Sequence, residues 1–127
     1  MDVYCISMKS QKRIWPELLE KIRSNGFDHV QIFPGVVGKN MPIPGTKELE
    51  KYGDPRTYMS IWAYHILTKN EGRRCHEQFP SWGAVGCYLS HLTLWKQLLA
   101  GPNDRMLIFE DDVVFRKNFK ENYKKAM

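Results

Sequence analysis

The chain is 127 residues long, the length of one domain of ordinary size, and 43% of its residues are hydrophobic. A chain of this composition can bury a core, so wholesale disorder is excluded. The long uncharged segment that begins at Gln78 contains proline, glycine, serine and histidine, which makes it a poor match to the roughly 20 apolar residues of a transmembrane helix. Asp2 follows Met1 and no apolar run comes after it, so no signal peptide is expected.

Basic residues outnumber acidic ones. Nineteen Lys and Arg against fourteen Asp and Glu give a formal net charge of +5, which suits an anionic partner such as a nucleotide, a phosphate-bearing glycan or a membrane surface. We expect no nucleic-acid partner. Near the C-terminus, only Glu121 stands among five basic residues, which are Arg116, Lys117, Lys120, Lys124 and Lys125. A solvated terminal helix and a helix that touches a membrane peripherally both fit this pattern.

The three cysteines cannot all pair within one chain, and no CxxC motif occurs. A reducing compartment is therefore favoured. We expect a cytoplasmic protein, and any membrane contact is expected to be peripheral. Cys5 and Cys87 have apolar neighbours, and Cys87 is expected to be a small buried residue. A zinc site formed by Cys75, His76, Cys87 and His91 is disfavoured by the unusual spacing of its first pair.

The first 33 residues predict a strand, a helix and a second strand. Val3–Ile6 forms a short apolar strand, and Ser7–Lys12 is expected to be a polar loop. Apolar residues at helical spacing follow, with Pro16 tolerated in the first turn and Gly26 at the end: Trp15, Leu18, Leu19 and Ile22. Val30–Phe33 is the second strand. Such a βαβ unit builds a parallel sheet with a right-handed crossover.

The middle of the chain predicts an irregular segment over residues 35–52 and a loop over residues 72–80. Between them, Asp54 and Pro55 form a helix start, because a carboxylate caps the first turn and proline fits its first position. The buried side of that helix is expected to contain Tyr58, Ile61, Trp62 and Ile66.

A further helix is expected between a Ser81 cap and a Gly101-Pro102 stop. Its buried stripe is predicted to be Val85, Tyr88, Leu92, Trp95 and Leu99. Met106–Phe109 then forms an unbroken apolar run, typical of a strand buried on both faces in the middle of a parallel sheet. A basic helix ends the chain.

Three adjacent carboxylates, Glu110, Asp111 and Asp112, follow the apolar strand directly. Like charges about 4 Å apart repel by roughly 1 to 4 kcal/mol, and a cation among them relieves this repulsion. Strand alternation would place Glu110 and Asp112 on one face and Asp111 on the other. Carboxylates at the carboxyl end of a strand suit Mg²⁺ or Mn²⁺, and ligands of open α/β sheets bind at this edge. A solvated acidic turn remains the alternative.

The sequence resembles glycosyltransferase family 25, which includes lipooligosaccharide galactosyltransferases and procollagen galactosyltransferases. The resemblance covers most of the chain and depends above all on two segments, Gly83-Ala-Val-Gly-Cys-Tyr-Leu-Ser-His-Leu-Thr-Leu-Trp95 and Leu107-Ile-Phe-Glu-Asp-Asp-Val-Val-Phe115. It implies a GT-A-like α/β nucleotide-binding sandwich with a mostly parallel sheet. It also implies transfer of galactose or glucose, with inversion, from a UDP-sugar donor to a glycan or glycoconjugate acceptor.

The resemblance implies roles for seven residues. Glu110, Asp111 and Asp112 match the family's DxD-like motif, with Asp112 as the direct ligand of Mn²⁺ or Mg²⁺. Four further residues would lie at the donor site, namely Ser7, Arg13, Ser90 and His91. Arg13 as a surface charge and His91 as a helix-packing residue bonded to backbone are the open alternatives. Ser90 and His91 do not predict a hydrolase, because neighbours on a helix point about 100° apart.

Two departures from the family pattern affect these expectations. Gly35-Val36-Val37-Gly38-Lys39 stands where the family usually has a small residue, an acidic residue and glycine. Family members also continue well past the Glu-Asp-Asp strand, so residues 1–127 are interpreted as one domain that forms a truncated, donor-binding N-terminal portion. No general base can be assigned, and the exposed sheet edge favours self-association. A non-catalytic nucleotide- or glycan-binding module is the alternative function.

Overall fold

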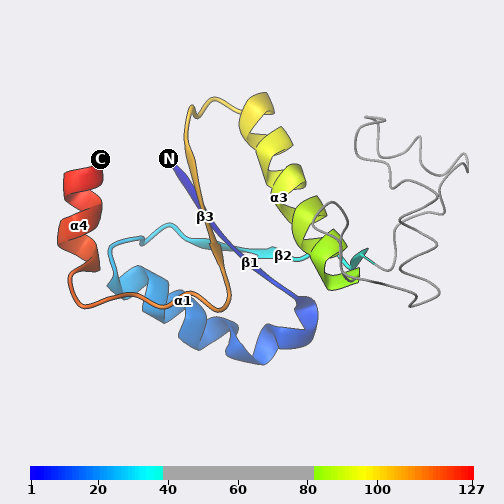
Figure 1. Ribbon diagram of the computed structural model, residues 1–127, viewed down its shortest axis with the longest axis horizontal. Coiled ribbons are helices and arrows are strands. Elements are labelled where there is room, and N and C mark those ends of the chain that lie inside the picture. Colours follow the sequence, from blue (N-terminus) through cyan, green and yellow to red (C-terminus); the bar gives the residue numbers. More distant parts are fainter. Residues whose placement is uncertain (39–81) are drawn as a thin grey trace, which may run out of the picture. The chain divides into compact units, whose positions relative to one another are not determined.

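The computed structural model describes residues 1–38 and 82–127, which form an α/β structure around a three-stranded parallel sheet (Figure 1). The chain divides into two compact units. The first comprises residues 1–35 and 93–127, and the second comprises residues 36–92. Each unit is described by itself below. Within the described residues, no helix has both the length and the apolar character that crossing a membrane requires.

The sheet lies in the first unit and has the strand order β2-β1-β3. β1 (Asp2–Ser7) pairs in parallel with β2 (Gln31–Pro34) on one side and with β3 (Met106–Glu110) on the other. This pairing confirms the expected parallel βαβ arrangement. Among the described residues, 106–109 do not occupy the middle of the sheet, where the sequence analysis expected them. β1 is the central strand, and β3 is an edge of the described sheet with only partly buried side chains.

The segment between β1 and the first α-helix differs from the sequence-based expectation. Instead of a polar loop, Lys9–Ile14 forms a 3-10 helix, η1, which begins with a hydrogen bond from the Gln11 N–H to the Met8 carbonyl oxygen (2.8 Å). Short 3-10 segments with i to i+3 bonds are common at the start of an α-helix. α1 (Trp15–Ser24) follows as expected, and Gly26, with φ of 103°, ends it.

One face of the sheet carries the main core. Val3 and Cys5 of β1 pack there with Leu18 and Ile22 of α1. Side chains from β2, β3 and the C-terminal segment complete the core, among them Ile32, Leu107, Phe109, Val113, Phe115, Phe119 and Tyr123. On the opposite face, Tyr4 accepts a 2.6 Å hydrogen bond at its Oη from Gln97 Nε2. The first unit is therefore held by an apolar core on one face and includes a polar contact on the other.

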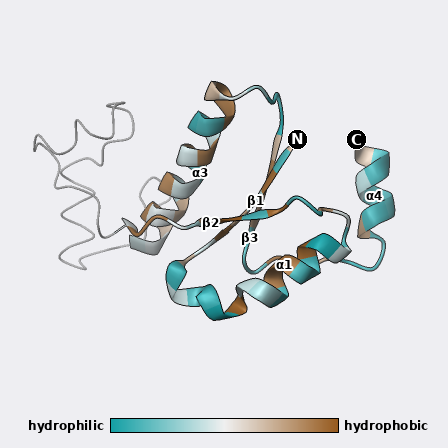
Figure 2. Cartoon of the chain, turned by 180° about the vertical axis from the view of Figure 1, so that it is seen from behind, coloured by the Kyte–Doolittle hydropathy of each residue, from teal (hydrophilic) through white to brown (hydrophobic). Residues whose placement is uncertain are grey.

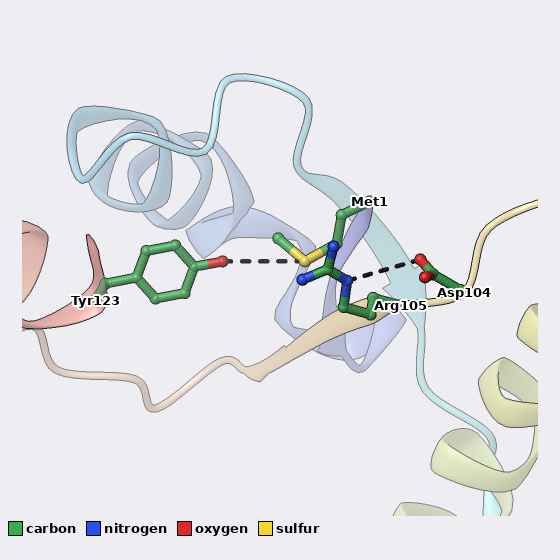
Figure 3. Close-up of polar contacts among 4 residues, drawn as sticks. All are labelled: Met1, Asp104, Arg105 and Tyr123. Carbon is green, nitrogen blue, oxygen red and sulfur yellow. Dashed lines mark hydrogen bonds and ion pairs between the residues drawn. The ribbon is translucent and has the colours of Figure 1, made fainter. Parts of the chain in front are cut away.

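The expected basic helix at the C-terminus is α4 (Phe119–Ala126). Its Phe119 and Tyr123 rings pack against Phe27, with centroid distances of 6.0 and 5.2 Å, and the rest of the helix is largely hydrophilic (Figure 2). Tyr123 Oη also donates to Met1 Sδ at 3.9 Å (Figure 3). The aromatic contacts attach α4 to the core and leave its lysines exposed. Membrane contact through these lysines stays a prediction, as does self-association through the sheet edge.

The second unit has its own small core. There Val85 and Leu89 of α3 (Trp82–Ala100) pack with Val36, Trp82 and Tyr88. A Cβ at Gly86 would collide with the Val36 carbonyl oxygen. The Ser90 hydroxyl, which is 1% exposed, donates to the Gly86 carbonyl oxygen (2.7 Å) and accepts the Val36 N–H (2.8 Å). Gly86 and Ser90 together thus fit the backbone at Val36 against the helix.

The predicted buried stripe of α3 is only partly correct. Val85 is buried, but Trp95 and Leu99 are 48% and 86% exposed, and Leu89 and Leu94 are buried in their place. Leucines stand on nearly every side of this helix, so apolar spacing alone does not identify the buried side. α3 ends at Ala100, before Gly101, as expected. The predicted helix after Asp54, the loops around it and the Ser81 cap lie outside the described residues.

Replacement of Ser90 tests the role of its hydroxyl in the second unit. We expect Ser90→Ala to lower the free energy of unfolding by about 1 to 3 kcal/mol, because the partly buried Val36 N–H loses its partner. Ser24→Ala is the matched control: Ser24 Oγ also donates to a backbone carbonyl, that of Lys21 (2.9 Å), but at an exposed site. The control should change stability by less than about 0.5 kcal/mol. Urea unfolding followed by circular dichroism measures both, and equal effects would refute the assigned role.

Candidate functional site

The carboxylates that follow β3 meet the end of β1 in the first unit. Ile6 pairs with Glu110, so Asp111 comes next to Ser7, one residue beyond the pairing. Ser7 Oγ donates a 2.8 Å hydrogen bond to Asp111 Oδ2, and Trp15 Nε1 donates a 2.9 Å hydrogen bond to Ser7 Oγ. Ser7 is only 2% exposed. The structure thus brings together two residues that sequence analysis assigned to different roles, Ser7 and Asp111.

The three carboxylates do not continue the strand as expected. β3 ends at Glu110, and Asp111 and Asp112 form a turn in which the Val113 N–H donates to the Glu110 carbonyl oxygen (3.1 Å). Strand alternation therefore does not decide the direction of Asp112. Glu110 and Asp112 are exposed, whereas Asp111 is half-buried and its Oδ2 accepts the hydrogen bond from Ser7. The turn offers two exposed carboxylates and one fixed carboxylate.

Helix α1 also holds this turn from its other end. Lys21 Nζ donates a 2.8 Å hydrogen bond to the Val113 carbonyl oxygen. A cavity of about 340 Å³ lies between the helix and the turn, lined by Ile14, Glu17, Leu18, Lys21 and Asp111. The side chain of Asp111 therefore borders open space as well as Ser7. No sequence pattern marked Lys21, and Trp15 was expected only as a core residue.

The other predicted donor residues have different surroundings. Arg13 is exposed in η1, where its Nη1 donates to the Ser10 carbonyl oxygen at 3.5 Å. Ser90 and His91 lie on the part of α3 that belongs to the second unit, and the Ser90 hydroxyl is bonded to backbone on both sides. His91 is half-buried. The assignment of these residues to a donor site stays a prediction.

The two described cysteines differ in environment. Cys5 is a fully buried thiol beneath the carboxylate turn, and Cys87 is exposed, so the expectation that Cys87 is buried is wrong. Cys87 lies on α3, and because this helix is apolar on several sides, apolar neighbours in sequence did not identify its buried side. Burial, and next the negative charge of Asp111, raises the pKa of Cys5 to about 12. Cys5 is therefore a protonated, structural residue at neutral pH.

The fold and the candidate site define an α/β protein with an acidic turn at the carboxyl edge of a parallel sheet. Comparison with known proteins identifies its family. The sequence matches the family described as glycosyltransferase family 25 (LPS biosynthesis protein) over residues 1–127. The chain belongs to this family, as the sequence resemblance indicated. No solved structure matches the chain.

The chain is similar to several curated proteins, two of which carry the family name. Human "Procollagen galactosyltransferase 2" is 40% identical over 99% of this chain and 18% of its own length. An Aedes aegypti "Glycosyltransferase 25 family member" is 25% identical over 93% of this chain and 17% of its own length. Mouse "Inactive glycosyltransferase 25 family member 3" is 34% identical over 55% of this chain and 10% of its own length. The chain thus spans less than a fifth of the length of these relatives.

The raised pKa of Cys5 predicts selective thiol chemistry. At pH 8 iodoacetamide should alkylate exposed Cys87 at least about 100-fold faster than Cys5, because only the thiolate reacts and Cys5 is both buried and protonated. Since the pKa of Cys5 in the folded state lies above the ordinary value of 9.0, this protection should persist up to pH 9 and weaken as pH rises toward 12. Peptide mass spectrometry measures the two rates. Labelling in urea is the control, and equal native rates would contradict the assignment.

Proposed function

We propose that this chain forms the sugar-nucleotide donor site of a glycosyltransferase, with the turn after β3 as its centre. The observation that carries the proposal is the Ser7–Asp111 hydrogen bond, which fixes one carboxylate of an acidic turn at the carboxyl edge of a parallel sheet. Open α/β sheets bind their ligands at this edge. Membership of glycosyltransferase family 25 supports the activity class, a glycosyltransferase.

The side chains of the turn fit a divalent cation. All three are carboxylates, and hard oxygen ligands suit Mg²⁺ and Mn²⁺. Asp112 is exposed and is our choice for the direct ligand, with Glu110 and Asp111 beside the metal or the donor ribose. A divalent cation bound here would neutralise the negative charge of a leaving diphosphate. Among the chain's own residues, Ser7 would keep Asp111 oriented, and Arg13 would supply positive charge beyond the end of β1.

The donor and acceptor are proposed from the family. We choose a UDP-sugar, with galactose before glucose because the human relative is named a galactosyltransferase. The acceptor would be a glycan or glycoconjugate, and transfer would proceed with inversion. The residue that removes the proton from the acceptor hydroxyl is not assigned to any described residue.

A non-catalytic binding module is the second candidate function. It is favoured by the relatives from mouse and human that are named inactive. A binding module would bind UDP or a UDP-sugar but would not cleave the bond between UDP and the sugar. Incubation with UDP-galactose, Mn²⁺ and a panel of glycan acceptors tests for the transferase: acceptor-dependent release of UDP supports it. Donor binding without release fits a binding module, and it equally fits a donor-binding portion that lacks the general base.

Calorimetric titration with UDP tests the proposed site. We expect binding with Mn²⁺ present and little binding without it, because the carboxylates repel the diphosphate unless a cation lies between them. Asp112→Ala should remove the metal-dependent part of binding and leave the melting temperature equal or higher, since one repulsive exposed charge is lost.

Glu121→Ala is the control for that titration. It also removes an exposed carboxylate, but from α4, and it should bind UDP as the unmodified chain does. Undiminished metal-dependent binding by the Asp112→Ala variant would refute the assignment of Asp112. Loss of binding in both variants would show that net charge, and not a defined site, governs the interaction.

A further inference from the structure

We propose that Trp15 is a positioning residue for the metal-binding turn, acting through Ser7 on the carboxylate of Asp111. This inference rests on the proposed function, and it concerns a residue to which neither the sequence pattern nor the family resemblance gave a role at the site. The three side chains form a hydrogen-bonded chain, from Trp15 Nε1 to Ser7 Oγ at 2.9 Å and from Ser7 Oγ to Asp111 Oδ2 at 2.8 Å.

The direction of both hydrogen bonds follows from the chemistry of the groups. An indole N–H can only donate, so Ser7 Oγ must accept from Trp15. The single hydroxyl hydrogen of Ser7 then remains for Asp111, whose ionised carboxylate can only accept. Because Ser7 is 2% exposed, solvent has little access to compete for its hydroxyl. Each hydrogen bond in such a chain polarises the next, so the indole makes Ser7 a stronger donor to Asp111.

The backbone explains why these residues meet. Ser7 ends β1, and the parallel register with β3 brings Asp111 beside it. The 3-10 helix η1 then returns the chain so that Trp15, the first residue of α1, reaches Ser7 from the helix side. Pro16 fits the first turn of α1 and fixes the backbone there. The three contributing backbone segments are thus a strand end, a helix start and a turn.

The fixed carboxylate retains a free side. Within the described part of the chain, the Asp111 side chain accepts one hydrogen bond, which comes from Ser7 and engages Oδ2. Asp111 also lines the 340 Å³ cavity beside α1. A carboxylate held by one oxygen in this way is already oriented when a ligand arrives, so less conformational freedom is lost on binding. Without Trp15, the Ser7 hydroxyl could rotate to other acceptors and Asp111 would lose this orientation.

Replacement of Trp15 by phenylalanine tests the inference, because it removes the N–H and keeps an aromatic ring. We expect Trp15→Phe to weaken Mn²⁺-dependent UDP binding about 3- to 10-fold in calorimetry, and Ser7→Ala to weaken it about 10-fold or more. Tyr123→Phe is the matched control, since it removes a polar hydrogen from an aromatic residue that instead contacts Met1 (Figure 3). The control should bind UDP as the unmodified chain does.

A double-mutant cycle distinguishes positioning from general packing. If Trp15 acts through Ser7, then Trp15→Phe should cause no further loss of affinity in a Ser7→Ala background. An additive loss would mean that the ring matters only for packing, and it would overturn the inference. Undiminished UDP binding by Trp15→Phe, where the unmodified chain binds in a metal-dependent manner, would overturn it as well.

The indole N–H resonance in an NMR spectrum provides a readout that needs no ligand and no folded Trp15 variant. Ser7→Ala and Asp111→Asn should each shift the Trp15 Nε1–H signal, whereas Asp104→Asn, at an exposed residue near the start of β3, should leave it unchanged (Figure 3). An unshifted signal in Ser7→Ala would refute the hydrogen-bonded chain. If the signal shifts but the unmodified chain shows no metal-dependent UDP binding, the hydrogen-bonded chain stands, and the proposed function and the positioning role both fail.

Discussion

The parallel pairing of β1 with β3 decides where the acidic turn lies. Ile6 pairs with Glu110, and the residues that follow them, Ser7 at the end of β1 and Asp111 at the start of the turn, therefore lie side by side on the face that α1 covers. A slip of one residue would turn every side chain of β3 to the opposite face and carry Asp111 away from Ser7. Leu107 and Phe109 oppose such a slip because they pack in the core on this same face. Apolar burial in β3 thus sets the position of the carboxylates that follow it.

Helix α1 links the stability of the first unit to the geometry of its acidic turn. Its apolar side buries Leu18 and Ile22 against the sheet. Its first residue, Trp15, reaches Ser7, and Lys21 reaches the Val113 carbonyl oxygen on the far side of the turn. The turn is therefore held at two points by a helix that cannot move without disturbing the core. A site supported by a packed helix keeps its geometry better than one supported by a loop alone.

The strands and α1 could be predicted from sequence because of their apolar patterns, and α1 also has a glycine stop signal. The C-terminal helix α4 was predicted from its run of basic residues. Two features could not. The contacts of Trp15 and Lys21 depend on the rotation of α1 against the sheet, and periodicity shows only which residues are apolar. The buried side of α3 was misassigned at Trp95 and Leu99 because that helix is apolar on several sides. For the site, the position of the carboxylates after β3 was predictable, but the turn that ends alternation at Glu110 was not.

The two segments that carry the family resemblance have different physical roles. In the helical segment, Gly86 and Ser90 fit the backbone at Val36 against α3, so a change there affects folding. In the segment after β3, Asp112 is exposed, so its replacement removes charge and leaves the buried core intact. The donor chemistry that we propose for this turn could therefore be lost without loss of the fold. This separation offers a physical reason why one family can contain both galactosyltransferases and members named inactive.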